Sequence, residues 1–429
     1  MVDASLAVLA SNALTARWVE VAGRHPGDFA LSGAAVWPLL AALAAGASAE
    51  ARAELERAIG MPAEDALAAA TNMIATIHRA VGAQAAIGLW VRAGFPLLAD
   101  WVEALPAGTR GLLHGPPRVD QAALDAWVKE RTLGILDRLP TQINDSTLLV
   151  LAACLAIRTR WATSFETSDS PEPVPAGPWA GRILHMLTAS FEDLERITVL
   201  DTRVGALTIF DSLGADDIDV HLVLDPEENT AGAVLGEGIA ALAGERPARG
   251  GGELRPGDTA PGLIVEEEQR ANPDPPVIQI QTVAFEVTAE HDLNDHADLF
   301  GLSTAADFSH RPFLGISDQP LAVQQARQSV RALFGAVDFE AAAVTSIALY
   351  GMALAPAPLQ YTVRVIRVAF DRPFGFLAVD RTSRLVLVAG WVENPMRHPY
   401  AEGIEKLDRA PAGPSYTTDL DPEVQEERP

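Results

Sequence analysis

The sequence contains one compact group of side chains that could bind a metal ion. His291, Asp292, Asp295 and His296 lie within the segment HDLNDH. Two histidines on one helical face need an i, i+4 spacing, which this segment lacks. The alternative is a polar, solvated helix start. The spacing favours the helix start, so we expect no metal site.

A second candidate for chemistry is Cys154, the single cysteine of the chain. It lies in the apolar run LLVLAACLAI, where a buried, inert thiol is expected rather than a nucleophile. The sequence contains no GxSxG, HExxH, CxxC, P-loop or GxGxxG pattern. A catalytic triad scattered through the sequence would leave no such motif. We therefore expect a protein that is not an enzyme and that uses no cofactor.

Composition limits the possible partners. The chain has 429 residues, 48% of them hydrophobic, which is enough apolar side chain for a large core and excludes wholesale disorder. Its formal charge is −25. Nucleic acids and anionic membranes are bound largely through Lys and Arg. We therefore expect no nucleic-acid partner and no membrane partner.

The N-terminus predicts a helix of the fold rather than a secretory signal. Residues 1–18 lack a basic region, and Asp3 and Ser11–Asn12 interrupt the apolar pattern. No stretch reaches the roughly 18 uninterrupted apolar residues that a membrane span needs. Cytoplasmic localisation is the default expectation, and export by another route stays open.

The order of predicted elements is typical of an α+β architecture. Ala- and Leu-rich segments with helical spacing fill residues 4–80, and β-type runs dominate after residue 180. The apolar run at 147–158 fits either a doubly buried strand or a buried helix. We expect a single domain over residues 1–395.

Two segments do not have a core pattern. Residues 243–276 are rich in Gly, Pro and charge and predict a polar surface excursion, in which Glu266–Glu268 would be solvated. Residues 396–429 cannot bury enough apolar surface to offset their ordering entropy, so we expect a mobile tail.

Five segments, in order, resemble the serpin family. They are LSGAAVWPLLAALAAGASAEARAELERAIG (31–60), LDAWVKERTLGILDRLP…STLLVLAACLAIRTRWATSF (124–165), VIQIQTVAFEVTAEHDLNDHADLFGLSTAADFS (277–309), AVDFEAAAVTSIALYGM (336–352) and FDRPFGFLAVDRTSRLVLVAGWVENP (370–395). Together the resemblance spans about nine-tenths of the chain. It implies the serpin fold, with a helical N-terminal region, three β-sheets including a large central one, and an exposed reactive-centre loop at about 338–362.

The segment at 336–352 resembles the family's loop hinge, which has two acids, Gly, Thr, Glu, then small residues and Thr. The resemblance assigns the hinge to Asp338, Phe339, Glu340, Ala341, Ala342, Ala343, Val344 and Thr345. Small side chains suit a segment that slides between paired strands. Ala enters an existing core with little steric resistance and loses no rotamer entropy.

In inhibitory serpins a protease attacks the loop, forms an acyl-enzyme and is dragged across the molecule as the cut loop inserts. The resemblance implies a monomeric suicide-substrate inhibitor of a serine protease, or of a cysteine protease. Counting as the family does from Glu340, the scissile bond falls near Met352–Ala353, to within several residues. An apolar side chain there suits elastase-, chymotrypsin- or subtilisin-like proteases.

The chain departs from the family pattern in three places. Asp338 and Phe339 replace the hinge Gly and Thr, and overpacking a formed core costs roughly 1–3 kcal/mol. The stretch between Glu340 and Phe370 is about ten residues longer than usual. The polar cluster beneath the opening sheet is largely lost.

In that sheet-opening region, the resemblance assigns family positions to four residues. Ser32 is retained, Gln328 stands where the family carries His, and Ala153 where it carries Asn. Trp161, at the point where insertion starts, is kept. These departures leave a second hypothesis open, a non-inhibitory serpin that acts as a binding or interaction protein. A hydrolase, the third class, has no motif behind it.

Overall fold

We describe the protein from a computed structural model, which covers residues 4–167, 172–226, 229–337 and 360–399. Helices dominate the N-terminal region, as the sequence predicts. They are α1 (Ala4–Ala22), α2 (Gly33–Gly46), α3 (Ala49–Ile59) and α4 (Ala63–Arg79). α2 is buried on almost every side, and Ser32 caps its first turn, with Ser32 Oγ accepting a hydrogen bond from the Ala35 amide at 3.1 Å.

The remaining helices lie between the strands along the chain. They are α5 (Ala99–Ala104), α6 (Pro117–Arg131), α7 (Ala231–Leu242), α8 (Ala297–Phe300) and the 3₁₀ turns η1 (Leu194–Arg196), η2 (Leu293–His296) and η3 (Phe308–His310). Among the residues that the structure covers, no helix combines the length and the apolar character needed to cross a lipid bilayer.

The central sheet has five strands in the covered residues. Its order is β14 (Phe285–Asp292), β15 (Gln325–Phe334), β4 (Leu149–Ile157), β2 (Ala83–Arg92) and β3 (Arg110–Leu113). β4 is the apolar run that fitted either a strand or a helix, and every one of its side chains is buried. Its alternate residues face two layers. Leu151, Ala153 and Leu155 join the main core with α2, and Val150, Ala152 and Cys154 join a smaller core beneath α6.

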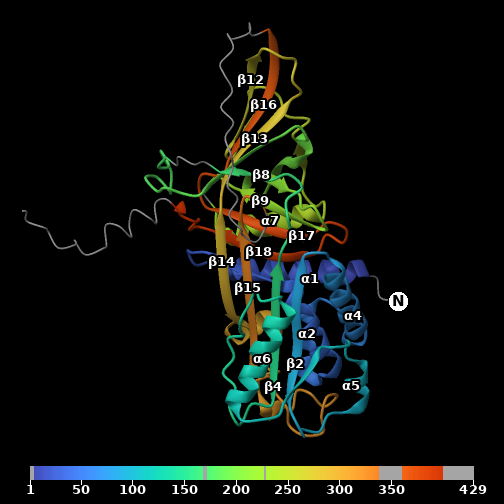
Figure 1. The fold of residues 1–429 in the computed structure, drawn as a ribbon. Helices are drawn as coiled ribbons and strands as arrows, with labels where there is room; N and C mark the ends of the chain where they lie inside the picture. The colour runs from blue at the N-terminus through green and yellow to red at the C-terminus, as the bar shows by residue number, and fades with distance from the viewer. Residues whose placement is uncertain (1–3, 168–171, 227–228, 338–359, 400–429) are drawn as a thin grey trace, which may run out of the picture.

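Two further sheets complete the molecule. A seven-stranded sheet has the order β1 (Phe29–Leu31), β18 (Val386–Val392), β17 (Phe374–Asp380), β9 (Ile218–Leu224), β8 (Gly205–Ser212), β7 (Ile197–Thr202) and β10 (Ala248–Gly250). A six-stranded sheet has the order β11 (Thr259–Ala260), β12 (Leu263–Arg270), β16 (Tyr361–Ala369), β13 (Val277–Val283), β6 (Met186–Phe191) and β5 (Glu166–Thr167). Figure 1 shows β12, β16 and β13 together at one end of the molecule, with β14, β15, β4 and β2 toward the other.

The predicted surface excursion at 243–276 is wrong in part. Its second half contains β12, whose Leu263 and Val265 are buried. The three glutamates at 266–268 lie on this strand, and Glu266 and Glu268 both form ion pairs with Arg367 instead of being merely solvated. The short apolar run at residues 263–265 was the available signal, and the surrounding Gly, Pro and charged residues masked it.

Of two further predicted boundaries, one agrees with the structure and one shifts. The reactive loop is expected to end at about residue 362, and β16 begins at Tyr361. The mobile tail was expected from residue 396, but the Met396 amide donates to Ala284 O at 2.9 Å and the His398 amide to Ile183 O at 3.0 Å. Residues 400–429 lie outside the covered part of the chain.

Candidate functional site

The candidate site is the seam between β4 and β15 in the central sheet. These two strands are parallel and pair from Gln325 opposite Val150 to Arg331 opposite Ala156. Their outer neighbours are antiparallel to them, β14 to β15 and β2 to β4. A strand that turns back after β15 would therefore run antiparallel to both sides of the seam. It would exchange one parallel ladder for two antiparallel ladders, and antiparallel pairing is slightly more stable per residue.

Gln328 on β15 binds the backbone of Ser32, which lies beneath the seam at the start of α2. Its side chain is fully buried, donates from Nε2 to Ser32 O at 2.8 Å and accepts from the Ser32 amide at 3.0 Å. The structure thus brings together two of the residues singled out in the sequence, Ser32 and Gln328. The expected loss of the polar cluster is only partly right, because Gln328 supplies two buried hydrogen bonds, whereas Ala153, opposite it on β4, supplies none from its side chain.

His291 lies in the same region beneath the seam, and the prediction of a solvated helix start is wrong for this residue. It lies on β14 opposite Gln328, not at a solvated helix start, and its Nε2 lies 2.8 Å from Ala30 O. Because a carbonyl only accepts, this nitrogen carries the proton. The ring also packs edge-on against Trp18. Burial lowers the pKa of His291, although the bond to Ala30 opposes that shift. The strand alternation Phe285, Val287, Ala289, His291 was the signal for this placement.

These polar contacts all lie on one side of the seam. They join residues 30–32 to β14 and β15. Within the covered residues, α2 and the strand before it form no side-chain hydrogen bond with β4 or β2, which contact α2 through apolar packing. Apolar surfaces can slide past one another without breaking directional bonds. The β4 side of the seam is thus the side that is free to shift over α2.

Trp161 holds the chain just beyond the end of β15. Its Nε1 donates to Gly335 O at 2.9 Å and its amide to Val337 O at 3.0 Å. The Phe165 amide donates to Ala336 O at 2.7 Å. Trp161 is buried and packs on Phe334, with ring centroids 4.7 Å apart. Trp161 therefore lies about a strand's length from Ser32 and Gln328 and forms a separate contact point at the top of the seam.

A partly buried ion pair supports Trp161 through Gly214. Trp161 forms a bridge with Gly214, whose amide donates to Asp219 Oδ1 at 3.0 Å. Arg381 binds Asp219 through Nε at 2.9 Å and Nη2 at 2.6 Å, and also donates to Gly214 O at 2.7 Å. Sequence reasoning missed Asp219 and Arg381, because residues so far apart in the chain give no local pattern.

The hinge residues and the scissile bond assigned by resemblance lie outside the covered residues. They are Asp338, Phe339, Glu340, Ala341, Ala342, Ala343, Val344, Thr345, Met352 and Ala353. The structure covers the chain up to Val337 on one side of them and from Gln360 on the other.

Cys154 lies within the seam but is not a candidate nucleophile. It is buried on β4, and burial raises the pKa of its thiol to about 12. A thiol with that pKa is protonated at neutral pH and therefore unreactive. This agrees with the inert cysteine expected from the apolar run.

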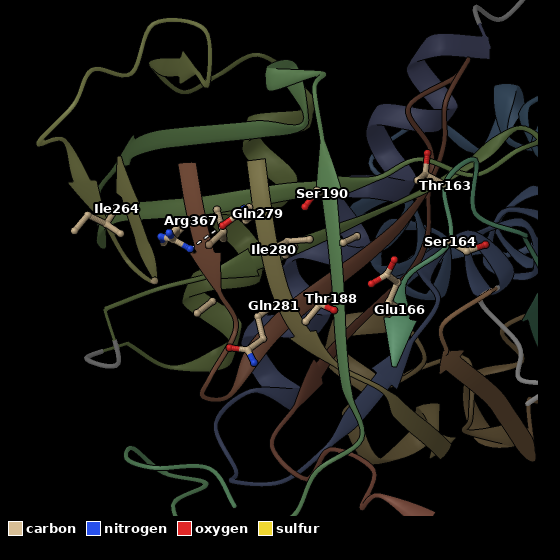
Figure 2. A pocket seen from close by; sticks show the side chains of 14 residues that line it. Thr163, Ser164, Glu166, Thr188, Ser190, Ile264, Gln279, Ile280, Gln281 and Arg367 are labelled. Carbon is tan, nitrogen blue, oxygen red and sulfur yellow. Dashed lines mark hydrogen bonds between the residues drawn. The ribbon is translucent and has the colours of Figure 1, made fainter. Parts of the chain in front are cut away.

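A groove of about 610 Å³ lies on one face of the six-stranded sheet (Figure 2). Its walls carry the hydroxyls of Thr163, Ser164, Thr188 and Ser190 with the carboxylate of Glu166. Among the covered residues that line the groove there is no histidine or cysteine, so none of them places an imidazole beside these hydroxyls to act as general base.

Comparison with solved structures identifies the fold. Human thyroxine-binding globulin aligns over 92% of this chain and 99% of its own, with a TM-score of 0.67 and 17% identity. Tengpin, a thermophilic serpin in its native state, aligns over 92% and 95%, with a TM-score of 0.68 and 14% identity. Serpin48 of the insect Tenebrio molitor aligns over 91% and 98%, with a TM-score of 0.65 and 16% identity. The chain has the serpin fold.

The sequence comparison agrees with this serpin fold. Residues 14–173 match the family model described as Serpin (serine protease inhibitor). No curated protein matches the chain in sequence. Low identity across nearly the whole length, together with a family match over the first part, is consistent with a divergent member of the serpin family. The expected α+β serpin fold with a helical N-terminal region is confirmed.

Within the serpin fold, the five-stranded sheet corresponds to the large central sheet that the resemblance implied. It is closed here, because β4 and β15 pair directly with no strand between them. Serpins are at family level inhibitors of proteases, and a similar fold also serves thyroxine-binding globulin, solved as a complex with thyroxine.

Proposed function

We propose that this protein inhibits a serine or cysteine protease by a suicide-substrate mechanism. The protease would cut the segment between β15 and β16, and the freed end would enter the seam between β4 and β15. The observation that carries the proposal is the closed parallel seam, which lies directly before that segment, with Gly335–Val337 held at its top by Trp161 and Phe165.

The sequence of the segment supports entry as a strand. In strand geometry alternate side chains point the same way, so Phe339, Ala341, Ala343, Thr345 and Ile347 would share one largely apolar face. That face would lie over the buried, apolar α2, as β4 does now. Burial of this face and the gain of two antiparallel ladders would supply the driving force.

The order of contacts also supports the proposal. Entry of residue 338 onward begins where Trp161 holds residues 335–337, and it proceeds toward the Gln328–Ser32 contact. Because Ser32 is attached to β15 and not to β4, the seam would open without breaking either hydrogen bond of Gln328. The apolar residue at Met352 favours elastase-, chymotrypsin- or subtilisin-like proteases as targets.

The test is incubation of the protein with elastase, chymotrypsin and subtilisin, followed by denaturing electrophoresis. The proposal predicts a covalent protein–protease complex that survives SDS with at least one of them. A Thr345→Arg variant, which places a charge on the inserting apolar face, should turn inhibition into simple cleavage. Clean cleavage of the unaltered protein by every protease would contradict the proposal.

A second candidate is a non-inhibitory serpin that binds another molecule. Phe339 favours it, because a bulky aromatic at the first inserting positions raises the cost of entry. Under this alternative, cutting the segment would leave the melting temperature of the protein nearly unchanged. Replacing Asp338 and Phe339 by Gly and Thr would then create inhibition where none existed.

A further inference from the structure

The strand that follows the proposed loop has partners along both edges. β16 pairs with β12 from Tyr361 opposite Arg270 to Val368 opposite Leu263. On its other edge it runs parallel to β13, from Val365 opposite Val277 to Ala369 opposite Gln281. β12 comes from the segment expected to be a surface excursion, and Figure 1 shows it alongside β16. β12 thus converts β16 from the end of a sheet into an interior strand.

Side chains reinforce the pairing of β12 with β16. Arg367 on β16 forms ion pairs with Glu266, at 2.9 Å, and with Glu268, both on β12. Its Nη1 also donates to Gln279 Oε1 on β13 at 2.7 Å (Figure 2). Arg367 therefore links the three adjacent strands across one face.

Two further bonds lie nearer the start of β16. Gln269 Nε2 donates to Thr362 Oγ1 at 2.7 Å, and Arg364 Nη1 donates to Leu254 O at 2.7 Å. On the opposite face, Leu263 and Val265 of β12 are buried beside Ile366 and Val368 of β16. The contact between the strands therefore has both an apolar side and a polar side.

We propose that β12 is a clamp that holds β16 in its sheet and so slows entry of the segment between β15 and β16 into the β4–β15 seam until that segment has been cut. This inference rests on the proposed function. In it Arg367 is a positioning residue, because it acts on the fixed end of the loop and not on the protease.

The uncut segment between β15 and β16 is barely long enough to insert while it is still attached to β16. A strand inserted along the 10 residues of β15 would run about 33 Å down the seam. While the chain is intact, residues 338–360 must supply both this leg and the return to Tyr361. Those residues would be almost fully extended, so the pull falls on the first residues of β16. Each residue drawn out of β16 breaks pairing with β12. A cut removes the return leg, and β16 then stays in place.

The test measures conversion of the uncut protein to a more heat-stable form during incubation below its melting temperature. Arg367→Leu removes the links to both glutamates and to Gln279. Because Arg367 is 46% exposed, each ion pair is weak, and we expect roughly five-fold faster conversion. The matched control is Arg270→Leu, since within the covered part of the chain Arg270 forms ion pairs with Glu268 and Asp274 and with no residue of β16. It should convert at the rate of the unaltered protein.

A disulfide between β12 and β16 should have the opposite effect on the rate of conversion. Gln269 and Thr362 are exposed and directly opposite, and the one native cysteine is buried, so a Gln269→Cys, Thr362→Cys pair can be oxidised selectively. The oxidised pair should not convert while uncut, yet should gain heat stability on cutting as the unaltered protein does. Reduction should restore the original rate.

The outcomes separate the two proposals. If cutting does not raise the melting temperature of the unaltered protein, the proposed function is contradicted. The proposal for β12, which rests on that function, is then contradicted as well. If cutting raises the melting temperature but Arg367→Leu and Arg270→Leu convert at equal, measurable rates, or the oxidised pair still converts, the clamp alone is overturned. If neither Arg variant converts, Arg364→Leu is added to Arg367→Leu, and a double variant that still does not convert also overturns the clamp.

Discussion

Gln328 and Ser32 exchange two buried hydrogen bonds that fix the start of α2 to β15. Gln328→Ala would leave the Ser32 amide and carbonyl without these partners in a dry site. An unsatisfied buried polar group costs about 1–3 kcal/mol. We therefore expect the free energy of unfolding, from urea titration, to fall by about 2–3 kcal/mol.

The control for Gln328 is Gln281→Ala, because Gln281 lies exposed on β13. It should change the free energy of unfolding by less than about 0.5 kcal/mol. Equal losses for the two variants would show that the Gln328–Ser32 contact contributes nothing specific.

Trp161→Phe removes the indole bond to Gly335 and keeps an aromatic ring against Phe334. We expect a loss of about 1 kcal/mol in unfolding free energy and faster hydrogen exchange at the amides of residues 161 and 165. Trp90→Phe is the matched control, since Trp90 is buried and its Nε1 has no hydrogen-bond partner among the covered residues. Unaltered exchange at residues 161 and 165 in Trp161→Phe would contradict this role.

Asp219→Asn tests the support behind Trp161. The amide keeps an acceptor for the Gly214 amide but loses the charge that faces Arg381. Asp219 is buried and Arg381 is about half exposed, so solvent screens the pair, and we expect a loss of about 1–2 kcal/mol. Arg381→Leu should cost a similar amount, and the double variant clearly less than the sum. Additive losses would mean that the two side chains act independently.

Acid should destabilise the protein through His291. Burial lowers its pKa, so the folded state favours the neutral ring, whereas the unfolded chain takes up a proton near pH 6.5. The stabilisation is therefore present above about pH 6.5 and is lost as the pH falls below that value. His78 and His185, whose pKa values are also lowered by burial, add to the same trend.

His291→Gln isolates the contribution of His291 to this pH dependence. The variant should lose less stability between about pH 7 and pH 5 than the unaltered protein, measured by denaturant titration at each pH. His114→Gln, at an exposed position, is the control. A pH dependence unchanged by His291→Gln would contradict the placement of His291.

Cys154 should resist a thiol reagent in the native protein, because its pKa of about 12 and its burial both suppress the thiolate. Labelling with a maleimide at pH 7 should require unfolding and should follow the unfolding rate. Rapid labelling of the native state would place Cys154 outside the closed β4–β15 seam.

The sequence predicted the N-terminal helices, and at 147–158 it predicted a buried element that could be either a strand or a helix, because both carry continuous apolar patterns at that length. It also assigned Ser32, Trp161 and Gln328 to one region through family resemblance. It could not show that Gln328 bonds the Ser32 backbone, since that depends on the register of β15 against α2. Asp219 and Arg381 were missed because their contact joins residues 162 positions apart.

The strand β12 shows a different limit of sequence reasoning. Three consecutive glutamates between Gly- and Pro-rich stretches predict a solvated excursion. In the structure two of them, Glu266 and Glu268, form ion pairs with Arg367, which lies about a hundred residues later in the chain. A partner supplied by a distant strand leaves no trace in a local window.

Thermal melting before and after limited proteolysis near residue 352 tests the central claim most directly. If the cut segment takes up the place between β4 and β15, the nicked protein should melt well above the intact one. A nicked protein that melts at the same temperature as the intact one, with its N-terminal fragment ending near residue 352, would contradict insertion into this sheet.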